Sequence, residues 1–334
     1  MKRFGLLYLA ILFLLTALGE NRITLAGAKE DAEKHYNDGI EFDKKRQFPE
    51  AIKELTQAVE LNPESHKYHQ ALFLTYTNNR KGLKGIEDYK RLERRWPKSA
   101  GVHFWLGRFY LESGNFEEAA KEIKEASLLS PKDEHIWLSL GHAWYRLGKN
   151  DEALEAYKKA NELTPHLAVV HTGLGNVYFK KKDYSRARKE YEEALKLDSS
   201  FEEARYNLSL IYEKQGETDR AIKEWKALLD ADPNESKIRE KLAGVYFKRK
   251  QYLEAVQEYS MLSQINQSNP AVYFRLGEAE VLLAAESDDP EEREHYKKGA
   301  IEAFQHTLMF DPKNQKAAAY LKKLKAPLPT AGKK

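Results

Sequence analysis

Residues 134–165 read EHIWLSLGHAWYRLGKNDEALEAYKKANELTP, and they end on a proline that recurs along the chain at a fixed interval. Prolines occupy five points of a grid of 34 residues, and serine and glutamine occupy the other two: Pro63, Pro97, Pro131, Pro165, Ser199, Pro233 and Gln267. A chain punctuated in this way is an array of similar supersecondary units. Such units bury their apolar faces only by stacking on their neighbours.

Reading back from each proline divides the chain into eight frames that agree in register. Position 7 is leucine in seven frames, position 8 is small in seven, position 11 is aromatic in seven, and position 20 is alanine or glycine in all eight. Small residues at positions 8 and 20 allow two helices to approach closely, and the large residues fill the space around that crossing. Each frame therefore predicts two antiparallel helices, with Gly114, Gly148 and Gly216 closing first helices in the left-handed conformation. The frames begin at Ala32, His66, Ala100, Glu134, Ala168, Glu202, Ser236 and Pro270.

This pattern resembles the tetratricopeptide repeat, whose Trp-x-x-Leu-Gly-x-x-Tyr, Ala-x-x-x-Phe and Pro positions it follows over residues 32–314. The resemblance implies an all-α fold, an α-solenoid that forms a right-handed superhelix of about eight helix-turn-helix repeats with a C-terminal capping helix. The predicted repeats span residues 32–65, 66–99, 100–133, 134–167, 168–201, 202–235, 236–269 and 270–314, followed by a capping helix at 315–325 and a disordered tail at 326–334.

The eighth repeat is longer than the others, because Pro312 lies 45 residues after Gln267. Within the excess of 11 residues, Asp289 and Pro290 are typical of a helix start, with aspartate as the cap and proline in the first turn. We therefore expect both helices of this repeat to be lengthened into a hairpin. The capping helix that follows is expected to turn Ala318, Leu321 and Leu324 inward.

The N-terminus has the pattern of an export signal. Lys2 and Arg3 precede an apolar run of 15 residues, Phe4 to Leu18, which is shorter than the ~20 residues of a typical membrane span. Ala26-Gly27-Ala28 is an acceptable cleavage site, so residues 1–28 are interpreted as a signal peptide. An uncleaved membrane anchor is the alternative. Either interpretation predicts that the repeats lie outside the cytoplasm, in the periplasm or beyond it.

Composition excludes several classes of function. The chain has 55 basic and 52 acidic residues and no cysteine, so it lacks a general attraction to nucleic acid or lipid, a disulfide framework and any thiol chemistry. His35, His69, His103 and His171 all fall at position 4. Equivalent positions of successive repeats are about 8 to 10 Å apart, too far for shared metal ligands, so they are interpreted as packing residues. We expect no metal, no cofactor and no catalytic constellation, and hence no enzyme.

The resemblance places a binding groove on the inner face of the superhelix, lined by positions 2, 5, 9, 12 and 13 of the first helices. Aromatic side chains with hydrogen-bond donors between them suit an extended peptide, which needs both pockets and partners for its backbone. The predicted aromatic residues are Tyr36, Phe104, Tyr145, Phe179, Tyr206, Phe247 and Phe274, and the predicted polar residues are Arg108, His142, Arg146, Asn176, Lys180 and Lys248.

A second hypothesis concerns the carboxylate clamp with which some members of this family hold a partner's C-terminus. Asn176, Asn207, Lys237 and Lys241 match four of its five positions, and Thr172 replaces the lysine of the fifth. Lysine at position 241 also lacks the bidentate fork of the family's arginine. Two amides and two ammonium groups at one point would hold a terminal carboxylate.

Taken together, the sequence predicts an exported, non-enzymatic scaffold that binds a protein or peptide, with no nucleic-acid partner. The resemblance suggests a role in envelope assembly, secretion or polysaccharide export. The alternatives are a carboxylate-clamp receptor and a non-catalytic repeat subunit of an enzyme complex, such as a glycosyltransferase.

Overall fold

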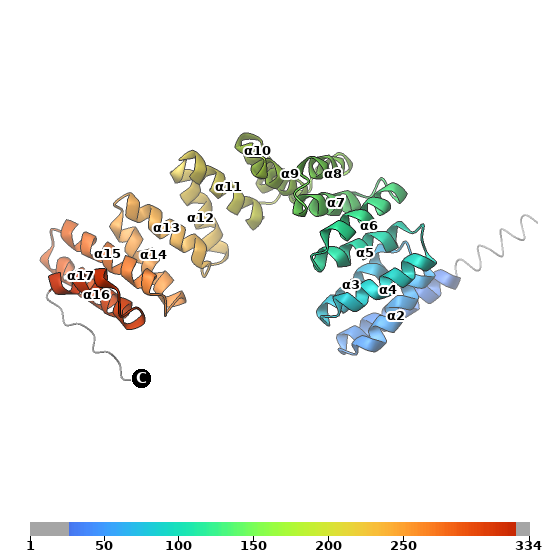
Figure 1. Cartoon of the computed structure of the whole chain (residues 1–334), viewed down its shortest axis with the longest axis horizontal. Helices are drawn as coiled ribbons and strands as arrows, with labels where there is room; N and C mark the ends of the chain where they lie inside the picture. Colours follow the sequence, from blue (N-terminus) through green and yellow to red (C-terminus); the bar gives the residue numbers. More distant parts are fainter. Residues whose placement is uncertain (1–26, 325–334) are drawn as a thin grey trace, which may run out of the picture. The chain divides into compact units, whose positions relative to one another are not determined.

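The computed structural model describes residues 27–324, and these residues form helices joined by short turns, with no strand among them (Figure 1). The predicted signal segment up to residue 26 and the predicted tail lie outside the described residues. Residues 27–44 form the first helix. The helices that follow are α2 (Phe48–Leu61), α3 (His66–Asn78), α4 (Gly82–Arg95), α5 (Ala100–Glu112), α6 (Phe116–Leu129), α7 (Glu134–Arg146), α8 (Asn150–Leu163), α9 (Ala168–Lys180), α10 (Tyr184–Leu197), α11 (Glu202–Gln215), α12 (Thr218–Ala231), α13 (Ser236–Lys248), α14 (Tyr252–Ile265), α15 (Pro270–Glu286), α16 (Pro290–Phe310) and α17 (Gln315–Lys323).

The predicted helical-repeat fold is confirmed, because α3, α5, α7, α9, α11, α13 and α15 begin at the first residues of frames two to eight. The small residues allow the two helices of a repeat to approach closely, as the pattern predicts. A methyl group on Gly141 of α7 would lie 2.7 Å from Cδ1 of Tyr157 in α8, and one on Gly175 of α9 would lie 2.6 Å from Cε1 of Tyr191 in α10. The alanines of position 20, from Ala51 to Ala300, are fully buried.

The chain divides between Ser199 and Ser200 into two compact units. The described part of unit 1 contains repeats one to five, and that of unit 2 contains repeats six to eight and α17. In unit 1 each helix packs on the next, and the first helices also contact one another in the order α3, α5, α7 and α9. We call the surface that they share the first-helix face of unit 1. The handedness of a superhelix over the whole chain stays a prediction.

The turn inside each of the first seven repeats contains one residue in the left-handed conformation, always at position 15. Gly114, Gly148 and Gly216 have φ of 78°, 76° and 74°, as predicted. In the other four repeats a basic residue adopts this conformation, with φ between 53° and 62°: Arg46, Arg80, Lys182 and Lys250. A side chain at positive φ costs free energy, so the repeat geometry imposes this turn even where glycine is missing.

The long hairpin of repeat eight is confirmed. Helices α15 and α16 have 17 and 21 residues, against 13 or 14 in repeats two to seven, and Asp289 caps α16 by accepting a hydrogen bond from the amide of Glu291. Helix α17 covers the end of unit 2 with Leu321 fully buried. Ala318 and Leu324 are only partly buried there, and Ala317 is the second buried residue.

Position 4 carries a hydrogen-bonding role that the sequence interpretation as simple packing missed. In six repeats its side chain donates to the carbonyl oxygen six residues earlier, in the turn that ends the previous repeat. The pairs are His69 with Pro63, His103 with Pro97, Trp137 with Pro131, His171 with Pro165, Arg239 with Pro233, and Tyr273 with Gln267, at 2.8 to 3.3 Å.

Several of these side chains also reach the second helix of their own repeat. Nδ1 of His103 lies 2.8 Å from Glu122, and the guanidinium of Arg239 lies 2.6 Å from Glu258. Glu93 approaches the same histidine, so that candidate ligand atoms of Glu93, His103 and Glu122 lie within 4.8 Å of one another. Both ring nitrogens of His103 are already hydrogen-bonded, to Glu122 and to Pro97, so this group is a polar link between helices.

Candidate functional site

The first-helix face of unit 1 contains a cavity of about 270 Å³. Three successive first helices line it, and apolar and polar groups contribute about equally to its wall. The lining residues are His66, Gln70, Phe73 and Leu74 of α3, Trp105 and Arg108 of α5, and His135, Leu138 and Ser139 of α7. We call it the unit 1 cavity.

Arg108 provides the charge of this cavity. Its guanidinium carbon lies 5.5 Å from the ring centroids of Phe73 and Trp105 and 5.9 Å from that of Phe104. Within residues 27–324 it forms no ion pair and donates no hydrogen bond. Burial lowers the pKa of Arg108, and Glu112 opposes that shift only in part. The cation is held in an apolar setting without a carboxylate partner.

Two histidines complete the rim. The rings of His66 and His135 stack at 5.6 Å, and the ring of His66 also lies 5.1 Å from that of Trp105. Burial and then the neighbouring His135 lower the pKa of His66, so its imidazole is neutral near neutral pH. The nearby acids are engaged at the start of α7. Asp133 accepts a hydrogen bond from the amide of His135 at 2.9 Å, and Glu134 lies 3.7 Å from Nε2 of the same residue.

The structure brings two of the predicted groove residues together in this cavity. Arg108 lines it, and Phe104 lies beneath, only 3% exposed, with the ring of His66 stacked at 6.2 Å. The prediction of an accessible aromatic surface does not describe Phe104, because Arg108 and His66 cover it.

Other predicted groove residues contact neighbouring helices. Nζ of Lys180 lies over the ring of Tyr145 at 4.3 Å and donates to its carbonyl oxygen, while Arg146 lies over the ring of Phe116 at 4.1 Å. Phe179 packs edge-on against Tyr184. These contacts join successive helices. Both polar residues of α7 predicted for the groove, His142 and Arg146, are exposed.

The residues of the clamp hypothesis are distributed over both units. In unit 1, Asn176 accepts a hydrogen bond from the hydroxyl of Tyr191 at 2.7 Å. In unit 2, Lys241 donates to Glu213 at 2.8 Å, Lys237 is exposed and Asn207 is half-buried. A ligand would have to compete with the pairing of Lys241, and the clamp stays a prediction.

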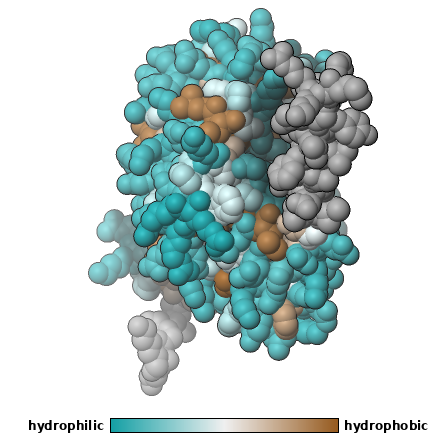
Figure 2. All heavy atoms as spheres, turned by 90° about the vertical axis from the view of Figure 1, so that its right-hand side faces the viewer, coloured by the Kyte–Doolittle hydropathy of each residue, from teal (hydrophilic) through white to brown (hydrophobic). Residues whose placement is uncertain are grey.

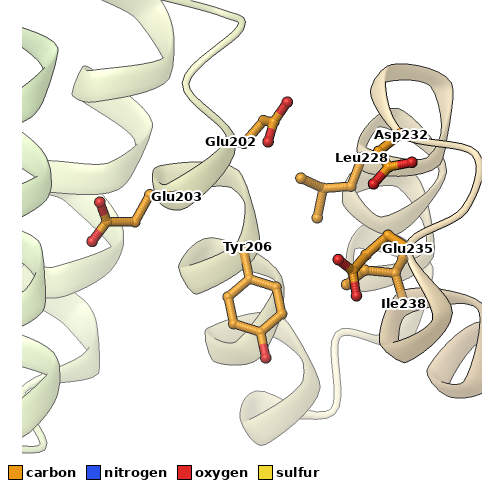
Figure 3. Close-up of a pocket in the computed structure, with 7 residues that line it drawn as sticks. All are labelled: Glu202, Glu203, Tyr206, Leu228, Asp232, Glu235 and Ile238. Carbon is orange, nitrogen blue, oxygen red and sulfur yellow. The ribbon is translucent and has the colours of Figure 1, made fainter. Parts of the chain in front are cut away.

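Unit 2 has a cavity of its own, of about 280 Å³, between α11 and the α12–α13 turn. Tyr206, Leu228 and Ile238 line it together with four acidic residues, Glu202, Glu203, Asp232 and Glu235. In Figure 3 the side chain of Glu203 points away from the others. Asp232 and Glu235 accept hydrogen bonds from backbone amides at the turn. The cavity therefore has an apolar floor and an acidic rim, the opposite charge to that of the unit 1 cavity. Tyr206 is the predicted groove residue that lines it, whereas Phe247 packs against Tyr252 instead.

Sequence reasoning named Arg108 and missed the other residues that line the unit 1 cavity. Four of them occupy repeat positions that the resemblance assigns to the groove: His135 at position 2, Gln70 and Leu138 at position 5, and Leu74 at position 9. These positions alone could have identified them. The signal for Phe73 was its size at position 8, where the other frames have a small residue. Nothing in the sequence pattern marked His66 or Trp105.

The face of the molecule drawn in Figure 2 is mainly polar. Figure 2 shows hydrophilic residues over most of one face, with the hydrophobic residues in small separate patches. Among the described helices, none combines the length and the apolar character needed to cross a membrane.

Comparison with family models assigns most of the repeats. Models described as tetratricopeptide repeat match residues 84–142 and 206–270, and a model described as TPR repeat matches residues 142–182 and 175–216. These matches extend without a gap from residue 84 to residue 270. A search of curated protein sequences found no match.

Solved structures with the same fold include PilF of Pseudomonas aeruginosa, 21% identical, with a TM-score of 0.53 over 65% of this chain and 99% of that one. The Cut9–Hcn1 hetero-tetramer of the APC/C is 17% identical, with a TM-score of 0.50 over 86% of this chain and 54% of that one. YrrB, described as a TPR protein with an unusual peptide-binding site, is 19% identical, with a TM-score of 0.48 over 61% of this chain and 99% of that one. At these identities the likeness shows the fold alone, an all-helical repeat solenoid.

Proposed function

Since the chain belongs to the tetratricopeptide-repeat family, we propose that it is a scaffold for protein–protein interaction that holds an extended segment of a partner on its first helices. The observation that carries this proposal is the unit 1 cavity. Its wall of Phe73, Leu74, Trp105 and Leu138 can take an apolar side chain, and Arg108 offers donors that no described residue uses. Aromatic and arginine side chains in a partly desolvated pocket are the features of a binding hot spot.

The size of the cavities supports a peptide rather than a small molecule. Volumes of about 270 and 280 Å³ fall below the roughly 300 to 1,000 Å³ of pockets that enclose a drug-sized ligand. Each suits one or two side chains of a longer segment. The cavity beside Tyr206, with its acidic rim, favours a basic residue of the partner. We propose a binding role without catalysis.

We further propose that the scaffold works outside the cytoplasm, in envelope assembly, secretion or polysaccharide export. The support is the pattern of Lys2, Arg3 and the apolar run that follows. Mass spectrometry of the protein from its native cells is expected to find an N-terminus near Lys29. If cleavage does not occur, the protein is expected in the membrane fraction with the repeats accessible from outside. Recovery of the full-length chain from the cytoplasm would refute this location.

The binding role is tested by site-specific crosslinking in those cells. A photoreactive residue at Leu138, in the wall of the unit 1 cavity, is expected to capture a discrete partner. Leu83 is the matched control, because it lies on the second helix α4 and its side chain is 73% exposed. Equal capture at both positions, or capture at Leu83 alone, would contradict a binding surface on the first helices.

A further inference from the structure

Resting on the proposed peptide-binding role, we infer that the unit 1 cavity binds a carboxylate of the bound segment, with Arg108 as the group that recognises it. The inference starts from the N–H donors of Arg108, which no described residue accepts. A guanidinium has five N–H donors, and that of Arg108 donates none of them to any residue in the range 27–324. Three aromatic rings surround it at 5.5 to 5.9 Å.

Other arginines of the chain show how this fold treats a partly buried cation. Arg205 and Arg239, at position 4 of repeats six and seven, each have a glutamate carboxylate at 2.6 Å on the second helix of the same repeat. Arg146 also lies over an aromatic ring, but it is exposed and water can solvate it. Arg108 combines the burial of the first pair with the lack of a partner, which leaves the pairing to a ligand.

Charge favours a carboxylate over a phosphate. Arg108 is the one residue lining the cavity whose positive charge is fixed, and burial lowers the pKa of the neighbouring His66. No acidic residue lines the cavity within the described residues, but three act on residues that do: Asp133 on His66, Glu134 on His135 and Glu112 on Arg108. A single negative charge balances Arg108. A dianion would leave one charge without a partner in this setting.

The geometry also limits the carboxylate to one with an apolar neighbour. Planar guanidinium groups bind both oxygens of a carboxylate side by side. The rings of Phe73 and Trp105 lie 5.5 Å from the guanidinium carbon, and Leu74 and Leu138 provide aliphatic surface in the same cavity. The source is either an aspartate or glutamate side chain or the end of a chain, flanked by an aliphatic or aromatic residue.

Four acetylated pentapeptides of leucine and alanine separate these sources. The first has a free terminal carboxylate, the second is amidated, the third is amidated with a central aspartate, and the fourth is amidated with a central asparagine. Each is titrated into the full chain while the Nε–Hε signal of Arg108 is followed by nuclear magnetic resonance. We expect the first or the third peptide to shift this signal and to bind about tenfold or more tightly than its neutral counterpart.

Substitutions at Arg108 and Arg146 test whether Arg108 causes the preference for the charged peptide over the neutral one. Arg108→Gln keeps the aliphatic stem and is expected to abolish the preference for the charged peptide, and Arg108→Lys is expected to keep a part of it. Arg146→Gln, which removes the other ring-stacked arginine of these helices, is expected to retain it in full. Circular dichroism and thermal unfolding of each variant establish that the fold is intact.

The inference is overturned if the charged and neutral peptides bind wild type and Arg108→Gln alike, if no peptide shifts the Arg108 signal, or if inorganic phosphate binds more tightly than the carboxylate peptides. Those results would leave the crosslinking at Leu138 unaffected, so the scaffold role would stand or fall separately. Failure of crosslinking together with a shift at Arg108 would contradict the scaffold role alone.

Discussion

Replacing Gly141 by alanine tests whether the close helix crossing determines the stability of a repeat. The added methyl group would lie 2.7 to 2.9 Å from three carbons of the Tyr157 ring. The same ring also lies close to Gly173 of α9, where an added methyl group would come within 2.7 Å of its Cε1 and Cζ. Gly141→Ala must therefore shift either the Tyr157 ring or one of the helices packed around it.

The expected cost follows from two opposing effects. Overpacking a closed core costs roughly 1 to 3 kcal/mol, and replacing glycine by alanine inside a helix recovers about 1 kcal/mol. Gly141→Ala should therefore destabilise repeats four and five by up to about 2 kcal/mol. Gly244 in α13 is the matched control, because it also lies inside a first helix and a methyl group there meets nothing within 4 Å. Gly244→Ala should stabilise its helix by about 1 kcal/mol.

Hydrogen exchange measured segment by segment is the suitable assay, since repeat arrays do not unfold as a single two-state unit. Faster exchange in α7, α8 and α9 of Gly141→Ala, and slower exchange in α13 of Gly244→Ala, are expected. Protection in α7 to α9 equal to or greater than that of the wild type would refute the argument that glycine is needed at this crossing.

Further predictions concern backbone strain and buried titratable groups. Lys182→Gly should stabilise unit 1 by about 1 kcal/mol in urea unfolding because it removes a side chain at positive φ, whereas Gly148→Ala should destabilise it by a similar amount. Burial, and then Glu302, raise the pKa of Glu280 to about 8, so the contribution of Glu280 to stability falls as pH rises from about 4.5 to 8. Glu280→Gln should therefore stabilise unit 2 by about 1 to 3 kcal/mol above about pH 8 and change its stability little near pH 5. Equal effects at both pH values would contradict this. Burial lowers the pKa of His69 to about 4, so this residue should destabilise the fold by up to about 3 kcal/mol as pH falls from 6.5 to 4, and unfolding of His69→Gln should depend less on pH in that range. The hydrogen bond to Glu122 raises the pKa of His103, whose contribution is present below about pH 6.5 and is lost at higher pH, so His103→Gln should cost more stability near pH 6 than near pH 8.

The fold could be predicted in detail from the sequence because each repeat imposes the same local requirements. Leucine at position 7, small residues at positions 8 and 20 and proline at position 32 fix the register, and seven first helices begin where that register places them. The left-handed residue of each turn was predicted only where it is glycine. Lys182 and Lys250 carry no local signal for this conformation, since the packing of the two helices imposes it on them.

The candidate site could be predicted only in part, because it depends on contacts between repeats. Position within a repeat identifies the helix face on which Arg108 lies, but it does not reveal that the rings of Phe73 and Trp105 lie against the guanidinium or that no carboxylate of the described residues forms an ion pair with it. The same limit applies to Arg146 and Lys180, because position does not reveal that they lie over the rings of Phe116 and Tyr145. Their role in a groove stays a prediction.

The residue at position 4 of a repeat forms a hydrogen bond with the turn in which the regular proline of the previous repeat lies. A proline that ends a repeat leaves its carbonyl oxygen at a turn between packed helices, where an unpaired acceptor is costly. Histidine, tryptophan, arginine and tyrosine differ in size and charge, yet each places one donor at the end of a side chain of suitable length, and each donates to the carbonyl six residues earlier. The array therefore preserves the hydrogen bond rather than the residue type.

This hydrogen bond joins the end of one repeat to the first helix of the next. A substitution such as Trp137→Phe, which keeps the packing and removes the donor, should therefore weaken the junction between repeats three and four more than it weakens repeat four itself. Hydrogen exchange confined to the start of α7 in that variant would support this argument, and uniform loss of protection through α7 and α8 would contradict it.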